Sequence, residues 1–157
     1  MIIDKLLANG IEPVVTMFHY DLPETLNLYG GFTNILLVKY FTNYAKLLFE
    51  TYGDRVKIWM TFNEPYDYCI PGYGDGNYPP MGHEHGVADY LCMDTTLKAH
   101  AAVYRLYREK FFEKQKGKIG ITLSSRFYFN KKNNATLVDR GMQYAVSIEI
   151  KHNRFTE

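Results

Sequence analysis

The stretch KIWMTFNEPYDYC, residues 57–69, combines the pattern of a buried strand with polar residues at its end. Its first half is largely apolar, and Asn63, Glu64 and Pro65 follow directly. Proline lacks a backbone N–H and biases the residue before it toward extended geometry, so the strand is expected to stop there. An amide and a carboxylate at a strand end fit either a solvated loop or the mouth of a pocket.

Length and composition limit what the chain can do. Its 157 residues suit one domain of ordinary size, and a hydrophobic content of 46% is enough for a sizeable core. The net charge of +1 gives no electrostatic reason to bind nucleic acid or an anionic membrane. No apolar run approaches the length of a membrane span. The two cysteines, Cys69 and Cys92, either pair with each other or remain free thiols.

Hydrophobic periodicity predicts helices and strands that alternate along the chain. Helices are expected over residues 2–9, 35–52, 89–113 and 137–150, and strands over residues 12–18, 56–62 and 118–123. Strands separated by helices pair in parallel through right-handed crossovers, so this order predicts an α/β fold.

Two of the predicted helices carry an apolar stripe at spacings of three and four residues. In residues 35–52 the expected stripe is Leu37, Phe41, Tyr44, Leu48 and Tyr52. In residues 89–113 it is Tyr90, Met93, Leu97, Ala101, Tyr104, Tyr107 and Phe111. Trp59 is expected in the core, and His100, which lies between two alanines, is expected to be structural.

Residues 63–88 form the one long irregular stretch that the sequence predicts. They contain five glycines together with Pro71, Pro79 and Pro80, and they begin at the polar end of the strand over 56–62. A loop of this length inside a compact domain is more often functional than idle. In parallel α/β folds, the loops after the carboxyl ends of the strands build the ligand site.

A second strand end also carries polar residues. His19, Tyr20 and Asp21 follow the strand over residues 12–18. Parallel strands place their carboxyl ends on the same side of a sheet, so these residues are expected near Glu64. Successive side chains of a strand point to opposite faces, and Asn63 therefore joins Glu64 in one pocket only if the backbone bends or bulges between them.

Five segments together resemble glycoside hydrolase family 1, which contains the retaining β-glucosidases, in the manner of its animal and insect members. The segments are TFNEP (61–65), HYDLP (19–23), YGGF (29–32), FETYGDRVKIWMTFNEP (49–65) and KGKIGITL (116–123). Their combination in this order is specific, whereas Asn-Glu-Pro alone would not be. The family fold is a (β/α)8 TIM barrel, so the resemblance implies a partial barrel with about strands 3 to 5 and their helices.

The resemblance also implies roles for individual residues. Glu64 matches the family's acid/base, which protonates the leaving oxygen and then deprotonates the incoming water. Asn63 would hydrogen-bond the sugar 2-hydroxyl, and His19 would bond another ring hydroxyl. Tyr20 stands where the family usually has Trp, so a ring of different shape would contact the sugar. The implied partner is a small-molecule β-glycoside, and no metal or cofactor is implied.

Retaining hydrolysis needs a second carboxylate about 5–5.5 Å from the first. In the family this nucleophile is the Glu of a Thr/Ile-Glu-Asn-Gly motif on a later strand, and no Glu-Asn-Gly occurs in this chain. Three strands cannot close an eight-stranded barrel, which takes about 250 residues. We therefore expect residues 1–157 to form one incomplete glycosidase-barrel domain, a fragment that lacks turnover alone.

Two other interpretations remain open. The chain could be a non-catalytic carbohydrate-binding or decoy protein that keeps the pocket wall without the nucleophile. A metal hydrolase that uses His83-Glu84-His85 is the other, but these residues are better interpreted as a polar loop, because the chain has no His-Glu-x-x-His and no third ligand at a recognised spacing. A transcript that continues through a Glu-Asn-Gly motif would favour the glycosidase over the binding protein.

Overall fold

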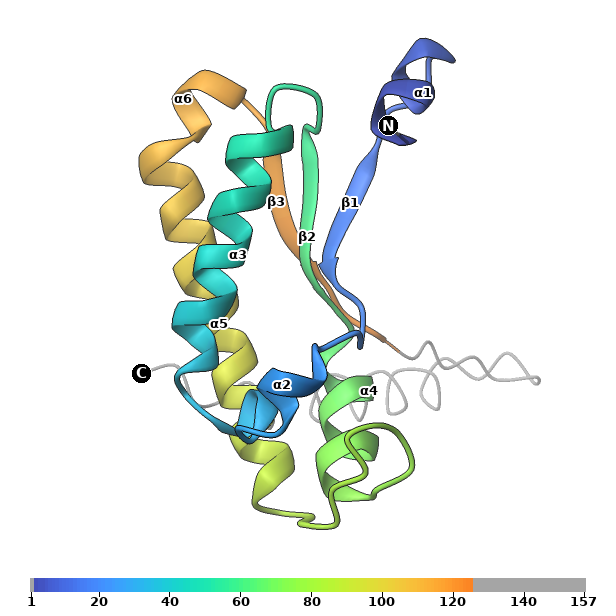
Figure 1. The fold of residues 1–157 in the computed structure, drawn as a ribbon, viewed down its shortest axis with the longest axis vertical. Coiled ribbons are helices and arrows are strands. Elements are labelled where there is room, and N and C mark those ends of the chain that lie inside the picture. Colours follow the sequence, from blue (N-terminus) through green and yellow to red (C-terminus); the bar gives the residue numbers. More distant parts are fainter. Residues whose placement is uncertain (1, 126–157) are drawn as a thin grey trace, which may run out of the picture. The chain divides into compact units, whose positions relative to one another are not determined.

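The computed structural model describes residues 2–125, in which three strands alternate with helices (Figure 1). The strands are β1 (Val14–Phe18), β2 (Ile58–Asn63) and β3 (Lys118–Thr122). The helices are α1 (Ile2–Ala8), α2 (Glu24–Asn27), α3 (Leu37–Tyr52), α4 (Pro65–Cys69), α5 (Ala88–Lys110) and α6 (Phe112–Gln115). Two further helical turns are η1 (Gly31–Thr33) and η2 (Ile70–Gly74). The helix expected over 137–150 lies outside the described residues.

The three strands form one parallel sheet in the order β1-β2-β3, which confirms the parallel pairing expected from the sequence. β2 is therefore the central strand, and Phe18 of β1 lies opposite Phe62. On its other side β2 pairs with β3, and the register shifts between Met60 and Asn63. This irregularity lies at the carboxyl end of β2, where the polar residues begin.

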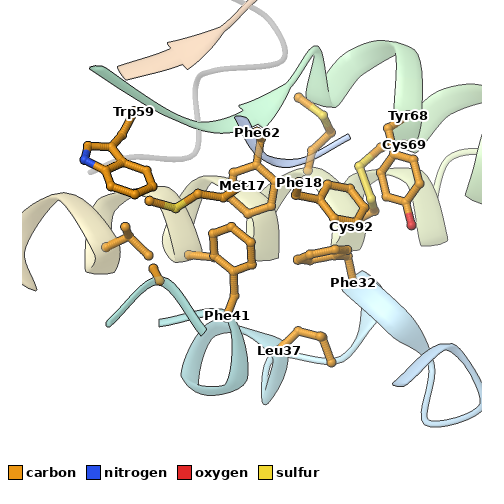
Figure 2. Close-up of a cluster of buried hydrophobic side chains, with 14 of the residues drawn as sticks. Met17, Phe18, Phe32, Leu37, Phe41, Trp59, Phe62, Tyr68, Cys69 and Cys92 are labelled. Atoms are coloured by element: carbon orange, nitrogen blue, oxygen red, sulfur yellow. A yellow bond between two sulfur atoms is a disulfide. The ribbon is translucent and has the colours of Figure 1, made fainter. Parts of the chain in front are cut away.

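Helices α3 and α5 pack against each other and lie together on one side of the sheet (Figure 1). Aromatic rings fill much of the space beneath them, and Figure 2 shows this cluster. The rings of Phe41 and Phe62 stack at 4.3 Å, and Phe18 meets Phe62 edge-on at 5.7 Å. Trp59 is fully buried, as expected. The aromatic content of the chain thus serves a packed core next to the carboxyl ends of β1 and β2.

The buried sides of the two long helices differ from the expected stripes. In α3 the buried residues are Leu37, Phe41, Ala45 and Phe49, whereas Tyr44 is 44% exposed. In α5 the expected Tyr90 and Tyr104 are exposed, and the buried set includes Cys92, Met93, Thr95, Thr96, Ala99, Val103 and Tyr107. Small residues let two helices approach closely, and large tyrosines fit better at the margin with their hydroxyls in water. A prediction from hydrophobicity alone therefore places these tyrosines in the core, although they lie at its margin.

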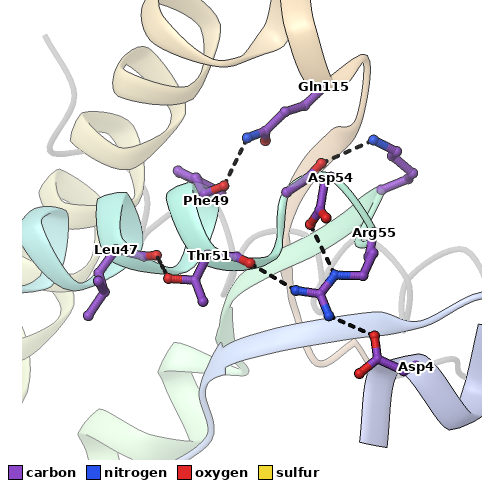
Figure 3. A network of polar contacts seen from close by, with 9 residues as sticks. Asp4, Leu47, Phe49, Thr51, Asp54, Arg55 and Gln115 are labelled. Atoms are coloured by element: carbon purple, nitrogen blue, oxygen red, sulfur yellow. Dashed lines mark hydrogen bonds and ion pairs between the residues drawn. The ribbon is translucent and has the colours of Figure 1, made fainter. Parts of the chain in front are cut away.

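The amino-terminal elements are less buried than the sequence suggested. The apolar strand over 12–18 is only partly covered: Val14 is 57% exposed, and β1 pairs only with β2 in the described part. Ile2 of α1 is likewise 79% exposed. Arg55 links α1 to the end of α3: its Nη1 donates to Asp4 Oδ1 at 2.7 Å and its Nη2 to the Thr51 carbonyl at 3.0 Å (Figure 3).

The stretch 63–88 is more regular than expected. It contains α4 and η2, although the sequence predicted an irregular loop. Pro65 occupies the first position of α4, where its missing N–H has no partner to lose. Among residues 2–125, no helix combines the length and apolarity that crossing a bilayer would need.

Candidate functional site

The backbone turns sharply where β2 ends. The Glu64 N–H still donates to the Thr122 carbonyl of β3 at 2.9 Å, but Glu64 itself is left-handed, with φ 40° and ψ 68°. The extended geometry expected before Pro65 is therefore wrong, while the bend expected between Asn63 and Glu64 is confirmed. A left-handed conformation costs a non-glycine residue about 1–2 kcal/mol, so the surrounding contacts must hold it.

The end of β1 makes a similar turn. Tyr20 also has a positive φ, of 73°, and the N–H of His19 donates to Asp21 Oδ1 at 3.0 Å. The rings of His19 and Tyr20 meet edge-on with centroids 5.2 Å apart. These turns aim side chains from two adjacent strands at one place beyond the sheet.

Three of the candidate residues contact one another directly. Asn63 Nδ2 donates to Glu64 Oε2 and to Tyr20 Oη, each at 3.4 Å, and Tyr20 Oη donates to the Glu64 carbonyl at 3.4 Å. His19 reaches this group through the ring of Tyr20, and its own side chain is exposed. All four residues singled out from the sequence therefore lie at the carboxyl ends of β1 and β2.

Two tyrosines that were not predicted from the sequence, Tyr68 and Tyr73, pack next to this group. The ring of Tyr68, on α4, stacks on Tyr20 with centroids 5.3 Å apart. Its hydroxyl lies 3.3 Å from the hydroxyl of Tyr73, which accepts the Phe32 N–H at 2.9 Å. Only a helix predicted directly after Pro65 would have placed Tyr68 one turn from Glu64 and so near this group.

The electrostatic surroundings keep the tyrosine hydroxyls protonated. Partial burial, with the negative charges of Glu64 and Asp67, raises the pKa of Tyr20. Burial also raises the pKa of Tyr68. Both phenols therefore stay available as hydrogen-bond donors. Within residues 2–125, Oδ2 of Asp67 is a buried oxygen without a hydrogen-bond partner.

Other candidate side chains take part in different contacts. His100 Nδ1 lies 2.8 Å from the hydroxyl of Thr61, and burial lowers the pKa of His100. His85 pairs with Asp89 at 3.1 Å and with Asp75 at 3.5 Å. In the part of the chain that the structure describes, no group of three or more His, Cys, Asp or Glu residues could hold a metal ion.

The two cysteines pair with each other. Cys69, the last residue of α4, forms a disulfide with Cys92 of α5, and both are fully buried (Figure 2). Composition had left both pairing and free thiols open. The bond joins the short helix that begins after Glu64 to the 23-residue α5.

Comparison with known proteins gives consistent matches. The model of Glycosyl hydrolase family 1 matches residues 1–152. Lactase/phlorizin hydrolase of Rattus norvegicus is 41% identical over 149 residues, which cover 92% of this chain and 8% of that protein. An aphid myrosinase structure has a TM-score of 0.80 at 41% identity and covers 91% of this chain and 32% of its own.

A rice β-glucosidase mutant in a covalent complex with Glc has a TM-score of 0.80 at 32% identity, with 92% of this chain and 33% of that chain covered. The described fold therefore fits part of an α/β TIM barrel. The chain spans about one third of these solved chains, and a smaller share of the rat protein.

Proposed function

The chain belongs to glycosyl hydrolase family 1, and from that premise we propose that it carries the acid/base half of a retaining β-glycosidase site. One observation carries the proposal: Glu64 is turned by a left-handed backbone at the carboxyl end of β2, with its carboxylate 3.4 Å from Asn63 Nδ2. Ligand sites of parallel barrels lie at this end of the strands. Glu64 is also partly accessible, as a proton donor to a substrate must be.

In this proposal Glu64 acts twice. Its protonated carboxyl first donates a proton to the glycosidic oxygen of the leaving group, and the resulting carboxylate then takes a proton from the attacking water. Asn63 donates a hydrogen bond to the sugar 2-hydroxyl, an interaction that strengthens as positive charge develops at the anomeric carbon. His19 bonds another ring hydroxyl, and the ring of Tyr20 contacts the sugar face.

The second carboxylate would come from outside these 157 residues, which contain no Glu-Asn-Gly. We place the chain at about strands 3 to 5 of the barrel, so the nucleophile would belong to a later strand. The covalent Glc complex of the similar rice enzyme supports the retaining chemistry and a small-molecule β-glycoside as substrate. The chain alone should then lack turnover. No separate observation favours the alternative of a non-catalytic binding protein.

The test requires a complete barrel. Residues 1–123 replace the matching segment of a complete relative, and Glu64→Gln is compared with Glu50→Gln. Glu50 is the matched control because it is an exposed carboxylate in the last turn of α3, paired only with Lys46 in the described part. Turnover is measured with alkyl glycosides, which need protonation of the leaving group, and with activated aryl glycosides, which do not.

We expect Glu64→Gln to lower kcat on alkyl glycosides by roughly 10²- to 10⁴-fold, the usual contribution of general acid catalysis. Activated aryl glycosides should keep a fast first step, and added azide should restore release of the sugar because azide needs no general base. Glu50→Gln should leave the turnover of both substrates unchanged. Equal, mild effects of Glu64→Gln on both substrates would contradict the acid role.

A further inference from the structure

We propose that the Cys69–Cys92 disulfide is a positioning device for Glu64, a role that rests on the function proposed above. The disulfide joins the end of α4 to α5, and α4 begins at the residue directly after Glu64. On this view the bond fixes where the acid/base side chain points, in addition to any effect on the stability of the chain.

The need for such a device follows from the weakness of α4 itself. This helix has five residues, and Glu64 provides no side-chain hydrogen bond to cap it. Isolated helices of this length are not stable in water. The left-handed backbone of Glu64 is a further local cost. The orientation of Glu64 must therefore be imposed by contacts made on both sides of it.

On the amino-terminal side, the sheet holds Glu64 through its N–H bond to the Thr122 carbonyl at 2.9 Å. On the carboxyl-terminal side, α4 is held by the packing of the buried Tyr68 and by the covalent link from Cys69 to Cys92. Cys92 lies in the first part of α5, which packs against α3 and the sheet, and it is fully buried. The disulfide thus connects a weak five-residue helix to the longest helix of the described chain.

Without the bond, the route along the backbone from α4 to α5 is long and glycine-rich. It runs through residues 70–87, which include five glycines, and glycine restricts a backbone less than any other residue. Within the described residues, Tyr68 would still stack on Tyr20 and bond Tyr73. These contacts hold the middle of α4, but the end of the helix at Cys69 would be connected covalently to α5 only through residues 70–87. Loss of the disulfide should therefore loosen α4 and the Glu64 turn while leaving the sheet in place.

A first experiment uses the 157-residue chain and needs no activity. Hydrogen exchange is compared in the native chain, in the double variant Cys69→Ala/Cys92→Ala, and in Val103→Ala. Val103 is a matched control because it is also fully buried on α5 but belongs to no contact with the Glu64 turn that we describe. In the double variant, residues 64–74 should exchange faster than in the native chain. The exchange rate over Leu37–Tyr52 should be unchanged.

The control variant Val103→Ala should instead raise the rate of hydrogen exchange along α5. The proposal is overturned if the double variant exchanges faster throughout the chain, as a bond that only holds the fold together would predict. It is also overturned if residues 64–74 exchange at the native rate, because α4 would then be positioned without the disulfide.

A second experiment uses the barrel chimera, in a host without disulfides of its own. The double variant should lower kcat on alkyl glycosides by up to roughly 10²-fold, the cost of misplacing a catalytic group by about 1 Å. KM should change little, activated aryl glycosides should be affected less, and Val103→Ala should leave kcat unchanged below its melting temperature.

The two experiments separate this inference from the function on which it rests. If Glu64→Gln lowers kcat and the double cysteine variant does not, the positioning role is wrong and the acid/base role stands. If Glu64→Gln has no effect on either substrate, the proposed function fails, while the exchange result still reports whether the disulfide holds the turn.

Discussion

Replacing Tyr73 with Phe removes one hydroxyl that serves two buried partners. Tyr73 Oη accepts the Phe32 N–H at 2.9 Å and lies 3.3 Å from Tyr68 Oη, and Tyr73 is 4% exposed. A buried donor left without its partner costs about 1–3 kcal/mol, and a net hydrogen bond is worth about 1 kcal/mol. We therefore expect the free energy of unfolding to fall by roughly 2–3 kcal/mol.

Urea unfolding followed by far-ultraviolet circular dichroism measures this loss. With a slope of about 2 kcal/mol per molar urea, the midpoint should fall by roughly 1–1.5 M while the slope stays the same. Tyr44→Phe is the control, since Tyr44 is 44% exposed and a surface change of this kind is usually within about 0.5 kcal/mol of neutral.

A double-mutant cycle with Tyr68→Phe separates the two bonds. The loss on changing Tyr73 should be smaller in the Tyr68→Phe background, because one of the two partners is already absent. The reasoning is refuted if Tyr73→Phe costs no more than Tyr44→Phe, since the Phe32 N–H would then have found another partner.

Two further predictions concern the core. Trp59 is the one tryptophan of the chain and is fully buried, so Trp59→Ala should cost about 3–5 kcal/mol in urea unfolding. Trp59→Phe should cost less, because Nε1 has no hydrogen-bond partner among the described residues and none is lost. Burial lowers the pKa of His100 below its ordinary value of 6.5, so the unfolded chain binds this proton more readily than the folded chain. The free energy of unfolding should therefore fall as the pH is lowered below about 6.5, and His100→Gln should remove that part of the fall in urea titrations at several pH values.

The parallel sheet and the meeting of two polar strand ends were predictable because they depend on strong, local signals. Apolar strands separated by helices pair in parallel, and parallel strands share a carboxyl edge. Tyr20 and Asn63 consequently lie within 3.4 Å of each other although 43 residues separate them in the chain. The bend at Glu64 followed only from the assumption that Asn63 and Glu64 share one pocket, because alternation along a strand otherwise sends neighbouring side chains apart.

Other features depended on contacts that no local pattern records. The left-handed backbone of Glu64 opposes the usual preference before proline, and tertiary contacts overrule that preference. The burial of Ala45 rather than Tyr44 depends on which face of α3 packs against the rest of the chain, and hydrophobicity alone does not fix that face. Pairing of Cys69 with Cys92 required knowing that α4 ends beside α5, which cysteine spacing does not reveal.

The central place of β2 has a consequence for changing what the protein recognises. Glu64 follows a strand with a bonded neighbour on each side, whereas His19 and Tyr20 follow β1, which has one such neighbour in the described part. The candidate proton carrier and one candidate sugar contact, Asn63, thus belong to the central strand and its end, whereas His19 and Tyr20 follow its neighbour. Tyr20 contacts both Asn63 and the Glu64 carbonyl, so it ties the two segments together. A library meant to explore new sugar preferences without moving the acid/base group should therefore keep Tyr20 and randomise His19, which makes His19 a natural starting point for directed evolution.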